Sequence, residues 1–267
     1  ANAALYCGAT VDFVDIDVET YNMSIEALRE KLVQAKKENK LPKLVVPVHF
    51  AGQSCEMKDI WELSKKYGFK VIEDASHALG GEYLGKKVGS CEYSHMAVFS
   101  FHPVKMITTG EGGAITTNDK DLDERIKLLR SHGIIKNKEK FKNNNDGDWY
   151  YEQQDLGFNY RLTDIQAALG ISQLKRLDSF VEKRREIANK YINELKNVEL
   201  PHQHLDTNSS WHLFVIKTKD RKEVFERLKK QEILTQVHYI PVTKQPFYNH
   251  KKLENSDDFY QHCLSLP

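Results

Sequence analysis

The sequence has no excess of charge of either sign and no long apolar run. Lysine and arginine number 39 against 38 aspartates and glutamates, which leaves a net charge of +1 over 267 residues. This balance gives no electrostatic reason to expect nucleic acid or an anionic membrane as a partner. No apolar run reaches the roughly 18 residues that a membrane-spanning helix requires. We therefore expect neither nucleic-acid binding nor membrane insertion.

Cysteine is also sparse. The four cysteines are widely spaced and form no Cys-x-x-Cys pair, namely Cys7, Cys55, Cys91 and Cys263. This spacing indicates neither a zinc site nor a disulfide framework, and we expect no metal. Reduced thiols are typical of a cytoplasmic protein, which is the predicted location.

What the sequence does contain is an alternation of strand and helix patterns. Strands are predicted at residues 10–15, 44–50, 71–74, 96–101, 113–117, 211–218 and 234–240. Three helices are predicted in the first half of the chain: one capped by Ser24, one over residues 58–67 with Gly68 as C-cap, and one from Asn118 or Asp119 to Arg130. Two more are predicted in the second half, from the capping box at residues 163–166 to Leu195 and over residues 220–231. This alternation predicts an α/β fold with a largely parallel sheet.

The pattern changes in two places along the chain. Residues 136–148 are rich in lysine and asparagine and predict a mobile surface loop. Beyond the long helix the pattern is that of a smaller α+β unit. We predict a large domain over residues 1–175 and a small one over 176–267. Because the chain begins without methionine and ends in what looks like another element, we expect it to be part of a longer protein.

Chemistry is concentrated where predicted strands end, because ligands of open parallel sheets bind at the carboxyl ends of the strands. After the strand at 96–101 the chain reads Ser-Phe-His-Pro-Val-Lys (100–105), followed by Gly-Glu-Gly-Gly (110–113). Lys105 among small residues is suited to binding a carbonyl cofactor; a solvated surface lysine is the alternative. Ser100 is a candidate phosphate ligand or an ordinary strand-end serine.

Two further strand or helix ends carry polar residues. Asp74 ends one strand and is suited to pairing with a protonated ring nitrogen, while His77 can reach another part of the same ring. Alternatively, Asp74 caps the next turn. Asn159 and Arg161 precede the capping box and could bind an anion at the helix N-terminus, although asparagine is also a common turn residue.

Together these segments resemble one family. The motifs occur in family order, as Glu-Asp-Ala-Ser-His (73–77), the 100–113 segment, Arg-Ser-His-Gly-Ile (130–134), Gly-Phe-Asn-Tyr-Arg-Leu (157–162) with Gln-Ala-Ala-Leu-Gly (166–170), and Ser-Trp-His-Leu-Phe (210–214). They resemble the DegT/DnrJ-type nucleotide-sugar aminotransferases, which are pyridoxal-phosphate enzymes of fold type I. The resemblance covers essentially the whole chain. It implies a mostly parallel central sheet with helices on both faces.

Within the family, the 102–109 segment and Val-His-Tyr at 237–239 look most like the PseC group. Enzymes of that group make UDP-4-amino-4,6-dideoxy-N-acetyl-β-L-altrosamine on the way to pseudaminic acid. The resemblance implies L-glutamate as amino donor and a UDP-linked 4-keto-6-deoxy-N-acetylhexosamine as acceptor. It also implies a homodimer with shared active sites. Met106 departs from the pattern, where proline is expected.

The resemblance also implies a role for each site residue. Lys105 binds the aldehyde of pyridoxal 5'-phosphate and moves the proton, and Asp74 pairs with the pyridinium nitrogen. The remaining roles fall to His77 near the phenolic oxygen, Ser100 at the phosphate, Asn159 at the phosphate of the neighbouring subunit's cofactor, and His238 and Tyr239 at the sugar nucleotide. The family's N-terminal phosphate loop and stacking aromatic would lie upstream of Ala1, and its last strand and helix after Pro267.

Three alternatives remain beside the leading function. The chain could aminate a different UDP- or dTDP-linked keto sugar. It could be a sugar dehydratase, although related dehydratases carry histidine in place of the cofactor lysine. It could also be a non-catalytic dimeric or regulatory relative that keeps the fold.

Overall fold

The structure is a computed structural model, and it describes residues 1–143, 146–248 and 250–267. Its helices are α1 (Asn2–Tyr6), α2 (Ile25–Lys37), α3 (Met57–Tyr67), α4 (Lys120–Arg130), α5 (Asp164–Leu174), α6 (Leu177–Glu194), α7 (Arg221–Lys230) and α8 (Glu254–His262), with 3-10 turns η1 (Phe50–Gly52), η2 (Lys138–Lys140) and η3 (Val242–Lys244). Its strands are β1 (Leu44–Val45), β2 (Lys70–Asp74), β3 (Glu82–Tyr83), β4 (Lys86–Lys87), β5 (Met96–Ser100), β6 (Gly113–Thr116), β7 (Ile134–Ile135), β8 (Glu152–Gln153), β9 (Thr207–Asn208), β10 (Phe214–Lys217) and β11 (Cys263–Leu266).

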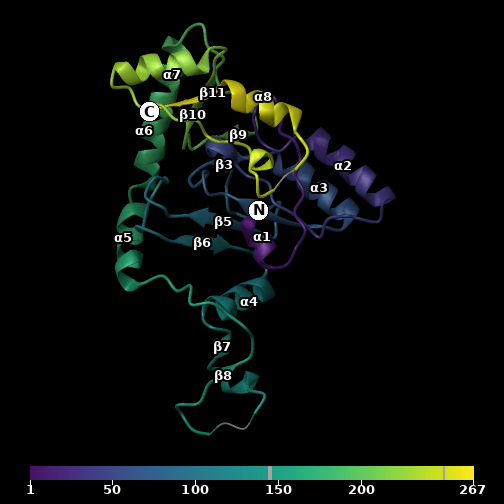
Figure 1. The fold of residues 1–267 in the computed structure, drawn as a ribbon. Coiled ribbons are helices and arrows are strands. Elements are labelled where there is room, and N and C mark those ends of the chain that lie inside the picture. The colour runs from purple at the N-terminus through teal and green to yellow at the C-terminus, as the bar shows by residue number, and fades with distance from the viewer. Residues whose placement is uncertain (144–145, 249) are drawn as a thin grey trace.

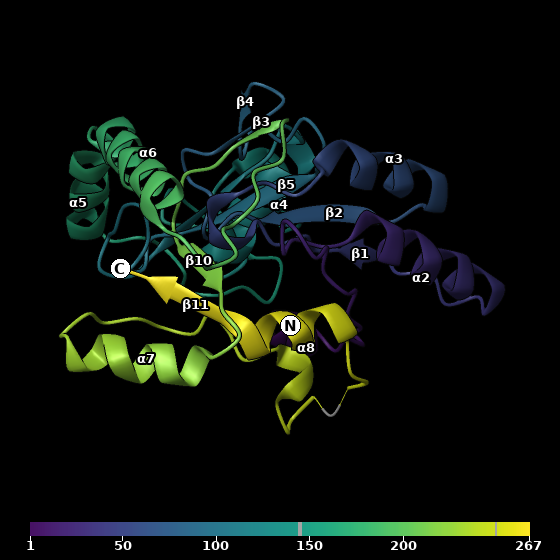
Figure 2. The same cartoon turned by 90° about the horizontal axis from the view of Figure 1, so that it is seen from above.

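The central sheet has the strand order β1-β2-β5-β6 and lies in the middle of the molecule (Figure 1). Strands β1, β2 and β5 are parallel, with Asp74 opposite Val98, and β6 is antiparallel to β5. The helices α2 and α3 lie at one side of the sheet, and α5 and α6 at the other (Figure 2). The α/β prediction is therefore confirmed, with a sheet that is mostly parallel.

The largest core cluster joins α2 and α3 to the start of the sheet. Its fully buried side chains include Leu28, Leu32, Ile60 and Val71. They follow helical spacing on α2 and α3 and alternation on β2, which is why these segments fold as an amphipathic pair against a strand. The hydroxyl of Ser24 accepts from the Ala27 amide at 3.2 Å, so the predicted N-cap is confirmed.

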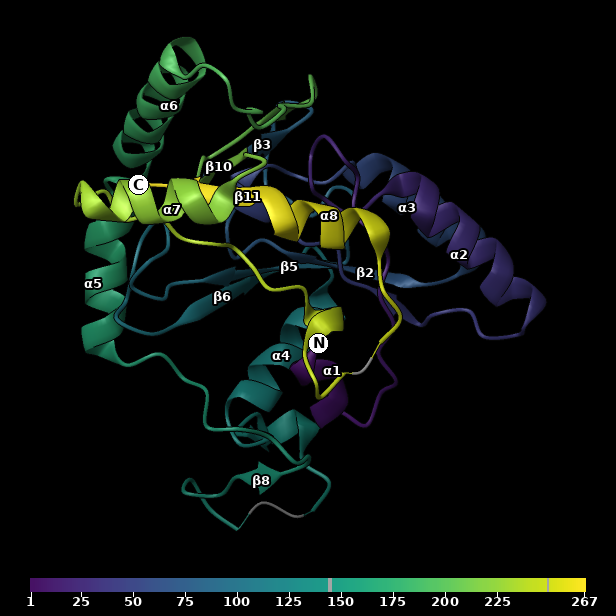
Figure 3. The same cartoon turned by 45° about the horizontal axis from the view of Figure 1, so that its top comes forward.

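A second layer is formed by the C-terminal part of the chain. Strands β10 and β11 pair antiparallel, and α7 and α8 lie in a row beside them, across the central sheet (Figure 3). A three-stranded sheet of order β4-β3-β9 ties the two halves of the chain together. In the part of the chain that the structure describes, no helix is both long enough and apolar enough to cross a bilayer.

Two of the predicted strands in the first fifty residues were wrong or too long. Residues 10–15 form no strand, because the Asp12 and Asp15 carboxylates accept from the next backbone amides, each at 2.8 Å. The strand predicted at 44–50 is reduced to β1. Pro47 lacks an amide proton, so the pairing beyond β1 continues only as a bridge between Val48 and Asp74.

Two predictions in the C-terminal half also needed correction. The long helix predicted up to Leu195 is two helices, α5 and α6, which meet at residues 175–176. No glycine or proline marks this break; the new helix begins where Ser179 Oγ donates to the Arg176 carbonyl. The strand predicted at 234–240 is a single bridge, Gln236 with Ser265. Beyond it the side chain of His238 contacts Ser265 Oγ, and that of Tyr239 contacts His77 Nε2.

Other boundaries agree with expectation or differ slightly. The capping box of Thr163 and Gln166 is present, and Gly68 ends α3 with φ +80°. The strand predicted at 211–218 is shortened to β10, since Trp211 has φ +51°. In the predicted loop at 136–148, residues 144 and 145 lie outside the described residues. The domain boundary near residue 175 stays a prediction.

Candidate active site

Three of the residues predicted for the site, Asp74, Ser100 and Lys105, lie at one edge of the central sheet. Asp74 is the last residue of β2 and Ser100 the last of β5, and Lys105 lies in the turn that follows. Because β2 and β5 are adjacent and parallel, their carboxyl ends share this edge. The Lys105 amide donates to the His102 carbonyl at 2.9 Å, which closes the turn.

Glycine allows β6 to return close beneath this turn. A Cβ on Gly113 would lie 2.6 Å from the Phe99 carbonyl oxygen, so no larger residue fits there. The Phe101 amide donates to the Gly112 carbonyl at 2.9 Å, and Gln166 Nε2 donates to the Glu111 carbonyl at 2.8 Å. The N-terminus of α5 therefore supports the loop that carries Lys105.

His77 forms the centre of a cluster drawn from both halves of the chain. Its ring is only 8 % exposed and lies 4.4 Å, centroid to centroid, from the ring of His212. Tyr239 Oη lies 3.4 Å from His77 Nε2. The ring of Phe50 flanks His77 from a third direction, at 6.2 Å.

The charges of the site are coupled across this cluster. Burial lowers the pKa of Lys105, and Asp74 opposes that shift. Burial, helped by the charge of Lys105, lowers the pKa of His77 to about 4. Burial and the neighbouring His77 lower the pKa of His212 to about 2. The site therefore holds two neutral imidazoles beside a lysine whose amine form is more accessible than in water.

Not every predicted residue joins this cluster. Ser100 Oγ accepts from the His102 amide at 3.4 Å and is partly exposed. His238 Nδ1 lies 2.8 Å from Ser265 Oγ, and burial and Lys105 lower its pKa. Asn159 is exposed and bridges to Ser131; within the described residues no hydrogen bond or ion pair joins it to Lys105.

Sequence reasoning assigned no role to His212 or Phe50, although both line the site. His212 stands in the Ser-Trp-His-Leu-Phe motif, which is the only signal for it. Its backbone carbonyl accepts from Arg184 Nη1 at 3.2 Å, and its own Nδ1 is buried with no hydrogen-bond partner among the described residues. Its proximity to His77, 135 positions earlier by residue number, depends on tertiary packing.

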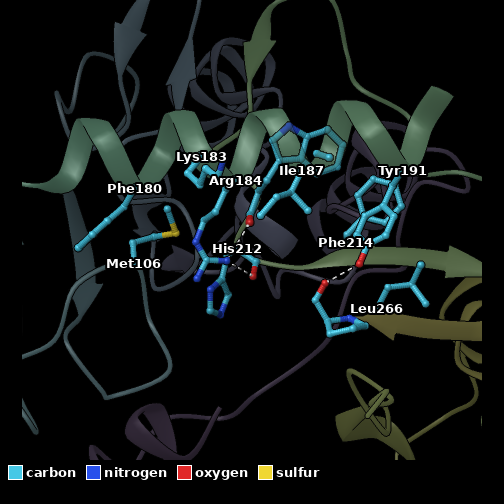
Figure 4. Close-up of a pocket in the computed structure, with 12 residues that line it drawn as sticks. Met106, Phe180, Lys183, Arg184, Ile187, Tyr191, His212, Phe214 and Leu266 are labelled. Carbon is cyan, nitrogen blue, oxygen red and sulfur yellow. Dashed lines mark hydrogen bonds between the residues drawn. The ribbon is translucent and has the colours of Figure 1, made fainter. Parts of the chain in front are cut away.

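A cavity of about 480 Å³ adjoins the cluster, and His212 belongs to its wall (Figure 4). The wall is mostly apolar and comes from α6, β10, β11 and the segment after Lys105; it consists of Met106, Phe180, Lys183, Arg184, Ile187, Ala188, Tyr191, Trp211, His212, Phe214, Leu266 and Pro267. Tyr191 Oη donates to the Pro267 carbonyl at 2.9 Å. The cavity thus lies between α6 and the strands β10 and β11, next to His212.

Comparison with known proteins places this geometry in context. The chain is 43% identical over 283 residues to a UDP-4-amino-4,6-dideoxy-N-acetyl-β-L-altrosamine transaminase of Campylobacter jejuni, covering 100% of this chain and 70% of that relative. It superposes with a TM-score of 0.88 on Helicobacter pylori PseC, an aminotransferase involved in the biosynthesis of pseudoaminic acid, at 38% identity, again over 100% and 70% of the two chains.

A further solved structure bears on the cofactor. The putative sugar aminotransferase Spr1654 of Streptococcus pneumoniae, in its PLP-form, superposes with a TM-score of 0.84 at 25% identity, covering 100% of this chain and 72% of that one. All of residues 1–267 match one family. The chain belongs to the DegT/DnrJ/EryC1/StrS aminotransferase family.

Proposed function

We propose that this protein transfers the amino group of L-glutamate to C4 of a UDP-linked 4-keto-6-deoxy-N-acetylhexosamine, in pseudaminic acid biosynthesis. The observation that carries the proposal is the placement of Lys105 and Asp74 at one sheet edge, with the pKa of Lys105 lowered by burial. A lysine that can lose its proton beside a fixed carboxylate is what an amino-transferring site requires.

The residues present fit pyridoxal 5'-phosphate. Asp74 offers a carboxylate for the ring nitrogen, Lys105 an amine for the aldehyde, and His77 a buried Nδ1 with no protein partner in the described residues. When bound, this cofactor supplies an aldehyde for covalent attachment and a ring that accepts an electron pair. Ser100 would hold its phosphate, and Asn159 the phosphate of the neighbouring subunit's cofactor.

Asp74 and Lys105 have separate roles in the proposed reaction. Asp74 would keep the ring nitrogen protonated by pairing with it. This pairing offsets the cost of burying the carboxylate charge of Asp74. Lys105 Nζ takes the proton from the α-carbon of glutamate. In the second half-reaction it delivers a proton to C4 of the sugar. This shuttle needs an unprotonated amine, and the lowered pKa of Lys105 supports that role.

The sugar nucleotide is the most specific part of the proposal. Relatives named as UDP-4-amino-4,6-dideoxy-N-acetyl-β-L-altrosamine transaminases favour a UDP-linked substrate. We place the sugar nucleotide against His238 and Tyr239, which are partly exposed beside His77.

The cofactor assignment is tested by absorbance with added pyridoxal phosphate. We expect a visible band from the lysine-bound cofactor, its loss in Lys105→Ala, and no loss in the control Lys86→Ala, an exposed lysine on β4. A Lys105→Ala protein that keeps the same band would refute the role of Lys105.

The substrate is tested by assaying amino transfer from glutamate to a panel of UDP- and dTDP-linked 4-keto sugars. The proposal predicts preference for the UDP-linked 4-keto-6-deoxy-N-acetylhexosamine. Preference for a dTDP-linked sugar would replace that substrate but keep the reaction, and elimination of a sugar hydroxyl without amino transfer would indicate a dehydratase.

We also propose that the protein acts as a homodimer with shared sites. The support is an exposed apolar surface on α5, where Ile165 is 85 % exposed and Leu169, Ile171 and Leu174 are also exposed. Such patches mark interfaces more often than free surface. Sedimentation should give a dimer mass, and Ile165→Glu should shift the equilibrium toward monomer. A monomeric wild-type protein with full activity would contradict the proposal.

The location is proposed to be the cytoplasm. All four cysteines are free thiols, three of them buried. This is the cysteine usage of a reducing compartment.

A further inference from the structure

The position of Lys105 depends on the loop that carries it, residues 101–112. Two backbone bonds close this loop at its ends: the Phe101 amide donates to the Gly112 carbonyl at 2.9 Å, and the Phe101 carbonyl accepts from the Thr109 amide at 3.0 Å. Among the described residues, no hydrogen bond or salt bridge holds the side-chain amine of Lys105. The placement of that amine therefore follows from how the loop backbone is held.

Helix α5 holds the far end of the loop. Gln166 Nε2 donates to the Glu111 carbonyl at 2.8 Å, and Thr109 Oγ1 donates to the same carbonyl, also at 2.8 Å. Thr109 is 3 % exposed, and a Cβ on Gly170 of α5 would lie 2.9 Å from its Cγ2. In two views α5 lies beside the end of the sheet where β5 passes into β6 (Figures 1 and 3). The Gln166 hydrogen bond and the packing of Thr109 against Gly170 therefore attach the loop to α5.

The side-chain amide of Gln166 has a fixed orientation. Its Oε1 accepts from the backbone amide of Thr163 at 3.0 Å, and a backbone amide can only donate. Its Nε2 faces the backbone carbonyl of Glu111, which can only accept. The two ends of this side chain thus have different tasks, because Oε1 caps α5 whereas Nε2 holds the loop.

We propose that Gln166 is a positioning residue: its Nε2 donor holds the 101–112 loop against α5 and so keeps the amine of Lys105 at the sheet edge of the candidate site. The support is the fixed donor on Gln166, its bond to the loop backbone at Glu111, and the buried Thr109 that shares this acceptor. The inference rests on the proposed cofactor-binding role of Lys105. It adds a function for Gln166 beyond the helix cap.

Three variants separate the two tasks of Gln166. Gln166→Glu keeps an oxygen for the Thr163 amide, as in the usual capping box, but at neutral pH it has no hydrogen to donate to the loop. Gln166→Met has a similar length, adds no charge and loses both bonds. Thr163→Ala removes the hydroxyl that accepts from the Gln166 amide at 3.3 Å, yet keeps the Nε2 donor. The loop should therefore respond to both Gln166 variants and not to Thr163→Ala.

Hydrogen exchange of the cofactor-free protein, followed by mass spectrometry, measures the loop directly. Loss of one ordinary hydrogen bond should speed exchange in peptides spanning residues 101–112 about fivefold in Gln166→Glu and in Gln166→Met. Thr163→Ala should leave these peptides unchanged and should speed exchange in peptides of α5 instead. Unchanged loop exchange in Gln166→Glu, or an equal increase in Thr163→Ala, would overturn the inference.

The consequence for Lys105 is measured in the protein loaded with pyridoxal phosphate, from the change of its visible band in a single turnover with saturating glutamate. Because misplacing a reacting group by about 1 Å can cost about 100-fold in rate, we expect a loss of about 10- to 100-fold in both Gln166 variants and the wild-type rate in Thr163→Ala. Urea midpoints measured beside these rates should be close to wild type for Gln166→Glu, since it keeps the cap.

Failure of this inference and failure of the proposed function give different results. Wild-type rates in both Gln166 variants would overturn the positioning role and leave the cofactor assignment intact. A wild-type protein that shows no band with pyridoxal phosphate would overturn the cofactor assignment, and with it the role of Gln166 toward Lys105, whatever the exchange of the loop.

Discussion

The buried network behind the site gives the sharpest stability prediction. His49 is fully buried and its Nε2 lies 2.8 Å from Glu73 Oε2; Glu73 is 5 % exposed and also accepts from Ser94 Oγ. The Cys55 amide donates to His49 Nδ1 at 3.1 Å, so the ring proton is on Nε2 and points to the carboxylate. Glu73 precedes Asp74 on β2, and the two side chains therefore point to opposite faces of the sheet.

His49→Leu should destabilise the fold strongly. It removes the main partner of a buried carboxylate and the acceptor of the Cys55 amide, while leucine fills a similar volume. Leaving a buried hydrogen-bonding group without its partner costs about 1–3 kcal/mol, and more where that group is charged. Against a total stability of about 5–15 kcal/mol, this is a large fraction.

The double variant His49→Leu/Glu73→Leu should be more stable than His49→Leu alone, because it removes the uncompensated charge. Urea unfolding at one fixed protein concentration measures both, since association with a partner subunit would shift the midpoint. His202→Leu, at an exposed histidine, is the control and should change stability by less than about 0.5 kcal/mol. A cost below about 1 kcal/mol for His49→Leu, or additive costs in the double variant, would refute the reasoning.

Three further predictions concern backbone, charge and capping. Gly52 has φ +106°, and a Cβ there would lie 2.7 Å from Ser210 Oγ, whereas a Cβ on Gly68, at φ +80°, would meet open space. Gly52→Ala should therefore lower the melting temperature clearly more than Gly68→Ala. Equal shifts in melting temperature would contradict the close approach at Gly52. Because the folded pKa of His77 is about 4 against 6.5 when unfolded, the unfolded chain takes up the proton first as pH falls, and His77 should cost up to about 3 kcal/mol of stability between pH 6.5 and 4. His77→Gln should flatten urea midpoints over that range, and an unchanged slope would argue against a buried neutral ring. Thr163→Ala removes the N-cap of α5 and should cost about 1 kcal/mol in urea unfolding, while Thr163→Ser should cost little.

Local chemistry made several elements predictable. Ser24, Gly68 and the Thr163–Gln166 pair mark helix ends, because capping involves only neighbouring residues. The failures have a different origin. Residues 10–15 and 234–240 have strand-like composition, but Asp12 accepts from Lys31 Nζ, Asp15 from the Asn255 amide, and His238 contacts Ser265. These partners are distant in the sequence, so the sequence pattern does not reveal them.

Sequence patterns were enough to predict the α/β class, the family motifs and the strand ends that carry Asp74, Ser100 and Lys105. These depend on periodicity and on short segments, which act locally. Tertiary packing brings His212 and Tyr239 against His77, and among the described residues it leaves Nδ1 of that ring without a hydrogen-bond partner. Contacts between residues more than 100 positions apart are set by how the C-terminal layer packs on the sheet, and no local pattern records them.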